Sequence, residues 1–103
     1  MAPSSALDGY RLLRLAIADP DPVVFLEPKA KYWAKEEGEL TTDGPGIGEG
    51  RVVREGDTCV VFAYGAMVAR CLETAEALEA DGLSVRVVEI GRASCRERVL
   101  RLV

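Results

Sequence analysis

The chain has 103 residues, of which 49% are hydrophobic and 29% charged, so it can form one small globular domain or pieces of two. Its net charge of −4 and pI near 4.8 argue against binding to nucleic acid or to an anionic membrane surface. No apolar run approaches the roughly 20 residues of a membrane span, and the first residues do not resemble a signal peptide. We therefore expect a cytoplasmic protein.

A helix is predicted near the start, with Ser5 as its N-cap and Asp8 favourably placed in the first turn. Its expected apolar stripe consists of Tyr10, Leu12, Leu13, Ala16 and Ile17. The prolines in 19–22 should end the helix, because proline cannot continue it. The apolar run 23–26 then predicts a buried strand that ends at Glu27.

Residues 41–51 are predicted to form a linker, with glycine at positions 44, 46, 48 and 50. A phosphate-binding loop would need a strand before the glycines and a helix after them, so that helix N–H groups meet the phosphates. The segment that follows, 51–54, is strand-like instead. We therefore interpret the glycines as part of a boundary between two segments.

The second half predicts a strand, a helix and a strand. Residues 58–63 form an apolar, β-branched run that is typical of a strand covered on both faces. A helix is expected over 66–80, with an apolar stripe of Val68, Cys71, Leu72, Ala75 and Leu78. Gly82 should end it in the left-handed conformation, and 85–88 resume a strand. This order predicts an α/β fold with a parallel, right-handed βαβ unit, which by itself identifies no chemistry.

Residues suited to catalysis are few. The sequence has no histidine, and its acidic residues do not have the spacing of a metal site. The serines Ser4, Ser5, Ser84 and Ser94 lack a base and the context of a nucleophile. Cys59, Cys71 and Cys95 are interpreted as reduced core thiols. From the residues alone we assign no catalytic, cofactor-binding or metal-binding residue.

Three further positions allow two interpretations each. Glu27 could be a site carboxylate, but a solvated or salt-bridged strand end is favoured. Tyr32–Trp33 could stack on a ligand, although packing at a domain or subunit interface is favoured. Tyr64–Gly65 precedes a helix N-terminus that could receive an anion, and a tight turn between strand and helix is the preferred interpretation.

Several stretches closely resemble the beta subunit of thiamine-diphosphate-dependent 2-oxo acid dehydrogenases. In the family's order they are Tyr10–Lys29, Tyr32–Trp33, Gly50–Gly56 and Val61–Met67. The Pro28–Lys29 and Tyr32–Trp33 variant is more similar to the branched-chain (2-oxoisovalerate) branch than to the pyruvate branch. The resemblance implies the end of a pyrimidine-binding domain over 1–40, the linker 41–51, and the start of a transketolase C-terminal domain, with an incomplete parallel sheet, over 52–89.

The resemblance also implies an activity for the whole subunit. Such enzymes decarboxylate a 2-oxo acid on thiamine diphosphate with magnesium and pass the acyl group to a lipoyl arm. The implied partners are an alpha subunit and a second beta subunit in a heterotetramer, and a lipoyl acyltransferase. The family's functional glutamate and histidine lie upstream of the matched segment, so Met1 is expected to mark a truncated start. We expect this chain to bind no cofactor and to be inactive by itself.

Residues 90–103 depart from the family and are predicted to be a non-native tail. After Val88–Glu89 the family would continue with an acidic residue and Leu-Arg-Ser/Thr-Leu, whereas this chain has Ile90-Gly91-Arg92. The decapeptide Ile90–Val99 also resembles, codon for codon, a translated short-read sequencing adapter. The tail carries four arginines and one acidic residue, whereas 1–89 carry nine basic and sixteen acidic residues. A basic interaction tail is the alternative interpretation.

Two alternatives to the beta-subunit fragment stay open: a noncatalytic βαβ interaction module, and a fragment of another transketolase-like enzyme. If the sheet is incomplete, we expect Val60, Phe62, Val85 and Val87 to lose some of the neighbours that would cover them. Because a small domain has only about 5–15 kcal/mol of stability, such losses predict a molten or aggregating chain. The unpaired strand edges would also favour association.

Overall fold

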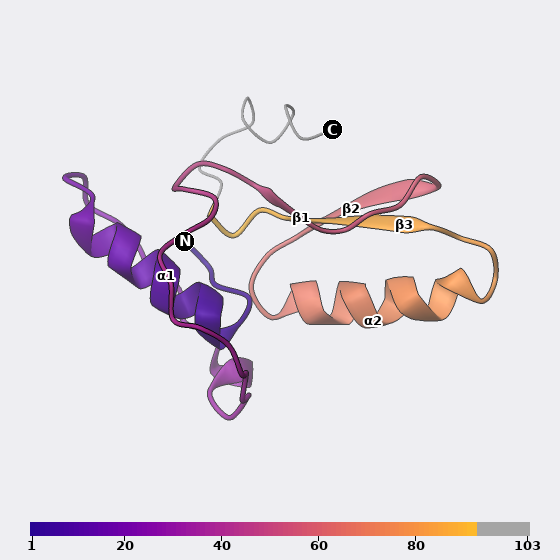
Figure 1. Ribbon diagram of the computed structural model, residues 1–103, viewed down its shortest axis with the longest axis horizontal. Coiled ribbons are helices and arrows are strands. Elements are labelled where there is room, and N and C mark those ends of the chain that lie inside the picture. The colour runs from indigo at the N-terminus through magenta and orange to yellow at the C-terminus, as the bar shows by residue number, and fades with distance from the viewer. Residues whose placement is uncertain (93–103) are drawn as a thin grey trace.

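The computed structural model describes residues 1–92, which form an α/β fold with a small sheet (Figure 1). In chain order the elements are α1 (Ala6–Ala18), the short 3₁₀ helix η1 (Lys29–Lys31), β1 (Arg51–Arg54), β2 (Cys59–Ala63), α2 (Met67–Glu79) and β3 (Val85–Glu89). Figure 1 shows α2 along one face of the sheet and α1 beyond one end of it. Within the described range, no helix has the length and apolar character needed to cross a membrane.

The sheet has the strand order β1-β3-β2. Strands β2 and β3 are parallel, with Cys59 opposite Val85 and Ala63 opposite Glu89, which confirms the predicted parallel βαβ unit. Strand β1 pairs antiparallel with β3, so the sheet is mixed and the expectation of a parallel sheet holds for two strands only. The physical reason is the short connection between β1 and β2, because parallel strands need a crossover of a dozen or more residues.

Helix α2 covers one face of the sheet and forms the main core with it. Val85 and Val87 are buried against Ala75, with Cys71, Leu72 and other half-buried apolar side chains around them. The expectation that these two valines would lose their cover was therefore wrong, because α2 lies over them. Gly82 has a positive φ of 77° just after the helix, as predicted for its end.

Strand β2 is more open than its sequence predicts. Val60 and Phe62 are 37% and 44% exposed, as expected for a strand that lacks some of its neighbours. The prediction that this strand is covered on both faces was wrong, since β2 lies at the edge of the sheet and α2 covers only one side. The physical reason is that an apolar run reports the propensity for burial, not the presence of a partner.

Helix α1 begins and ends where the sequence predicts. The Ser5 hydroxyl accepts a hydrogen bond from the Asp8 amide at 3.2 Å, and the helix ends at Ala18. Its apolar stripe was predicted only in part, because Leu12 is fully buried while Leu13 and Ile17 are 48% and 75% exposed. The inward face instead carries Asp8 and Arg11, which are paired with charged or polar groups.

The predicted strand over 23–26 does not form. Among the described residues, the backbone of this segment bonds only to Met1, whose amino group donates to Val24 O at 2.6 Å and whose carbonyl accepts from Leu26 N at 2.8 Å. A strand needs a neighbour of similar length to satisfy its backbone groups, and a single residue does not provide one. Val24 and Leu26 are accordingly exposed.

Candidate functional site

The main polar feature of the described chain is a buried ionic cluster at the carboxyl end of β3. Glu89 ends this strand, Asp8 lies in the first turn of α1, and Arg92 follows two residues after Ile90; all three are almost fully buried. Nη2 of Arg92 donates to Asp8 Oδ1 at 2.5 Å and to Glu89 Oε2 at 3.0 Å. We call these residues the Asp8–Glu89–Arg92 cluster. It joins the N-terminal segment to the sheet.

Two further arginines extend the cluster. Arg51 of β1 donates to Glu89 Oε2 from Nε at 3.1 Å and from Nη2 at 2.8 Å. Arg11 of α1 donates to Asp8 Oδ1 at 3.4 Å and to the Asp43 carbonyl at 2.9 Å. The glycine-rich segment is thereby held against α1, and β1 against β3.

The two carboxyl groups are pushed in opposite directions. Burial and the neighbouring charge of Glu89 raise the pKa of Asp8, although Arg92 and the Ser4 amide oppose this. For Glu89, burial acts in the same direction, but the Ser4 hydroxyl and the charges of Arg51 and Arg92 outweigh it and lower the pKa. Burial also lowers the pKa of Arg92, against the attraction of both carboxylates. Opposed shifts in a close carboxyl pair are typical of groups that compete for one proton.

The cluster lies where open α/β sheets usually bind ligands, outside the carboxyl ends of the strands. In this chain that position is filled by its own N-terminal segment. Ala2 N donates to Gly91 O at 2.8 Å, and a side chain at position 91 would overlap the Ala2 backbone. The arrangement therefore favours a structural role for the cluster, with the charges used to hold two segments together.

A cavity of about 450 Å³ lies beside the cluster, between the start of α1 and the β1–α2 side of the sheet. Ser4, Ser5, Lys31, Glu36 and Arg51 supply its polar lining. Glu36 already accepts a hydrogen bond from Leu7 N at 2.9 Å, so a carboxylate of the chain itself occupies the anion-binding end of α1. The cavity thus lacks a free set of converging donors.

Glu27, Tyr32 and Trp33 lie on the surface near η1, away from the cluster. The Tyr32 hydroxyl donates to Glu27 Oε2 at 2.8 Å, and this bond and the carboxylate charge raise the pKa of Tyr32. Trp33 is 93% exposed. These three residues therefore form a solvated surface group; the predicted interface role for the aromatic pair stays a prediction.

Tyr64 and Gly65 form a turn between β2 and α2. Met67 N donates to Tyr64 O and Val68 N to Gly65 O, both at 3.3 Å, and Gly65 has a positive φ of 57°. This geometry matches the tight turn that was the preferred interpretation. Among the thiols, Cys71 is half-buried against the core, but Cys59 is exposed at the sheet edge, so the core interpretation of Cys59 was wrong. Ser94 and Cys95 lie outside the described residues.

Sequence reasoning missed the cluster. The sequence predicts only a capping role for Asp8, and Glu89 follows an apolar run just as the exposed Glu27 does, so this pattern does not mark a buried charge. Arg92 was assigned to the predicted tail. Asp8 and Arg92 are 84 positions apart, so no local pattern could predict that they pair.

The comparisons with known proteins agree with the fold. Residues 48–92 match the family "Transketolase, C-terminal domain". A solved structure named "Split gene transketolase, inactive beta4 tetramer" has a TM-score of 0.74 and 28% identity, over 88% of this chain and 29% of that one. The small α/β sheet with its crossover helix is thus a transketolase C-terminal domain fold, as the sequence predicted.

The similarity extends to particular enzyme subunits. The beta subunit of the pyruvate dehydrogenase E1 component of Bacillus subtilis is 42% identical over 96 residues, which is 89% of this chain and 29% of that protein. The 2-oxoisovalerate dehydrogenase subunit beta of the same organism is 43% identical over 91 residues, which is 85% of this chain and 27% of that protein. These matches confirm the resemblance to 2-oxo acid dehydrogenase beta subunits. The chain spans less than a third of each relative.

The described residues contain no cluster of metal-ligating side chains. Within residues 1–92 no group of three or more His, Cys, Asp or Glu side chains could hold a metal ion, and the sequence has no histidine. The two buried carboxylates, Asp8 and Glu89, are already paired with arginines. We therefore assign no residue of this segment to thiamine diphosphate or magnesium.

Proposed function

We propose that this chain is part of the beta subunit of a 2-oxo acid dehydrogenase decarboxylating component and is inactive by itself. The complete subunit would take part in oxidative decarboxylation of a branched-chain 2-oxo acid or pyruvate, with thiamine diphosphate and magnesium, and in acyl transfer to lipoyl. The observation that carries this proposal is the similarity to beta subunits over more than four-fifths of the chain, on both sides of the glycine-rich segment.

We assign the segments as the resemblance implies: the end of the pyrimidine-binding domain over 1–40, the linker 41–51, and the start of the transketolase C-terminal domain over 52–89. Asp8 belongs to the first of these segments and Glu89 to the third, so the two buried carboxylates lie where the segments meet. In this proposal they perform no chemistry.

We further propose that residues 90–103 are foreign. What supports this is the departure of Ile90-Gly91-Arg92 from the continuation that the resemblance implies, and the resemblance of Ile90–Val99 to a translated adapter. Long-read sequencing of the source locus should diverge from this sequence after about codon 89. Recovery of the same codons for Ile90–Val99 in intact genomic DNA would overturn this part of the proposal.

The partners of the complete protein would be an alpha subunit, a second beta subunit and a lipoyl acyltransferase, in the cytoplasm. The similar split-gene transketolase is named as an inactive β4 tetramer, which supports the expectation that beta chains without an alpha partner are inactive. Its similarity also keeps a second family assignment open, namely a fragment of another transketolase-like enzyme.

Calorimetric titration of the purified chain with thiamine diphosphate and magnesium tests the proposed inactivity. We expect no saturable heat, because the glutamate that activates the pyrimidine ring in such enzymes lies upstream of the matched segment and the chain has no histidine. The matched control is the complete Bacillus subtilis beta subunit assembled with its alpha subunit, titrated under the same conditions. Saturable binding by this chain with a micromolar dissociation constant would contradict the proposal.

A noncatalytic interaction module is the second candidate function, and the exposed apolar side chains of β2 favour it. Reading the genomic DNA on both sides separates the two candidates. An in-frame upstream segment that encodes the expected glutamate and histidine, beside an alpha-subunit gene, supports the enzyme subunit. Genuine stop codons on both sides support the module.

A further inference from the structure

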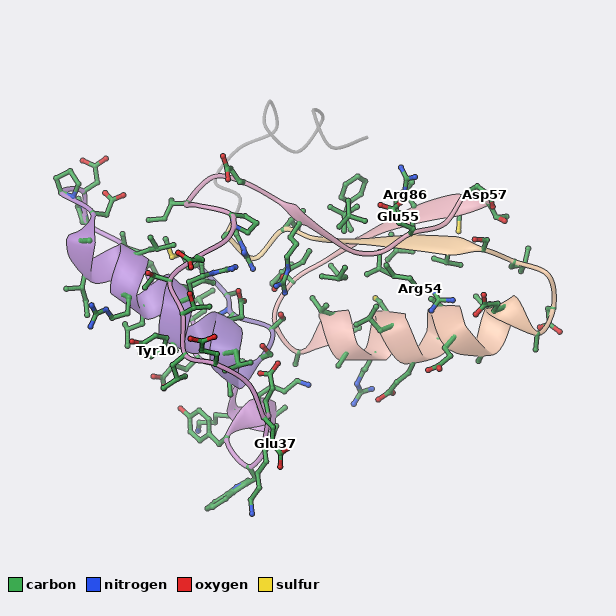
Figure 2. The ribbon with its side chains drawn as sticks, viewed as in Figure 1. Tyr10, Glu37, Arg54, Glu55, Asp57 and Arg86 are labelled. Atoms are coloured by element: carbon green, nitrogen blue, oxygen red, sulfur yellow. The ribbon has the colours of Figure 1, made fainter. Side chains whose placement is uncertain are left out.

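We draw no further inference here: the strongest candidate, the open outer edge of β2 (Figure 2) with the apolar groove of about 210 Å³ between this strand and α2, carries none, because nothing in the part of the chain that the structure describes shows what covers it.

Discussion

Asp8 and Glu89 accept hydrogen bonds from the same atom, Nη2 of Arg92, at 2.5 and 3.0 Å. One carboxylate comes from the first turn of α1 and the other from the last residue of β3. The contact between the N-terminal segment and the sheet therefore depends on buried charges more than on apolar packing. This dependence leads to testable consequences for pH and for substitution.

The two carboxylates should give opposite slopes of stability against pH. The pKa of Asp8 is raised above its ordinary 3.8, so its contribution to stability is complete below that pH and is lost as the pH rises through the folded-state pKa. The pKa of Glu89 is lowered below 4.5, so its contribution is present above that pH and is lost as the pH falls through the folded-state pKa. Urea unfolding at a series of pH values measures both effects. Asp8→Asn should remove the loss of stability that occurs as the pH rises above 3.8. Glu89→Gln should remove the loss of stability that occurs as the pH falls below 4.5. Equal slopes in the two variants would contradict these directions.

Removing the shared cation should destabilise the chain strongly. Arg92→Met leaves two buried carboxylates without their common partner, and breaking a buried ion pair costs about 3–5 kcal/mol. Urea unfolding followed by far-UV circular dichroism measures the loss. The control Arg70→Met, at an exposed position, should stay within about 0.5 kcal/mol of the wild type. The double variant Asp8→Asn/Arg92→Met should recover part of the loss; strict additivity would show that the pair is not coupled.

Gly56, in the connection between β1 and β2, should not tolerate a side chain. A Cβ at this position would overlap the backbone of Val85 and Arg86, so Gly56→Ala must displace the start of β3. We expect a loss of about 1–3 kcal/mol or more. Gly82→Ala is the matched control, because Gly82 has a positive φ but open space around it and should lose only about 1 kcal/mol. Thermal unfolding compares them, and equal melting temperatures would contradict the steric argument.

Leu12 and Ile17 allow a test of which side of α1 faces inward. Leu12 is fully buried, so Leu12→Ala should cost about 2–5 kcal/mol. Ile17 is 75% exposed, and Ile17→Ala should change stability by no more than about 0.5 kcal/mol. Chemical denaturation of both variants decides the point. Similar losses at both positions would mean that the other side of α1 is covered in solution.

The local signals in the sequence predict the helices and the parallel pair well. The period of apolar residues in α2, its terminal Gly82, and the N-cap Ser5 of α1 are features of neighbouring residues, and the structure confirms what they predict. The apolar run over 23–26 was misleading, because strand formation also requires a partner that the run does not encode. Whether a strand lies inside a sheet or at its edge, as for β2, is likewise decided by distant segments.

The ionic cluster could not be anticipated from local patterns. Glu27 and Glu89 both follow apolar runs, yet Glu27 is exposed and Glu89 is buried. The identity of the partners of Glu89 is a property of the folded chain: Arg51 and Arg92 approach Glu89 from different elements, and Asp8 arrives from the N-terminal helix. The family match over 48–92 includes Arg92, but a match of this kind does not say which side chains pair.

The surface position of Trp33 determines what the fluorescence of this chain can measure. It is the sole tryptophan of the sequence and is 93% exposed, so its indole already experiences water in the folded state. Unfolding should therefore shift its fluorescence maximum very little. A protein that covers the turn around η1 should move the emission to shorter wavelength, so this one side chain serves as an intrinsic optical probe for a partner at that surface.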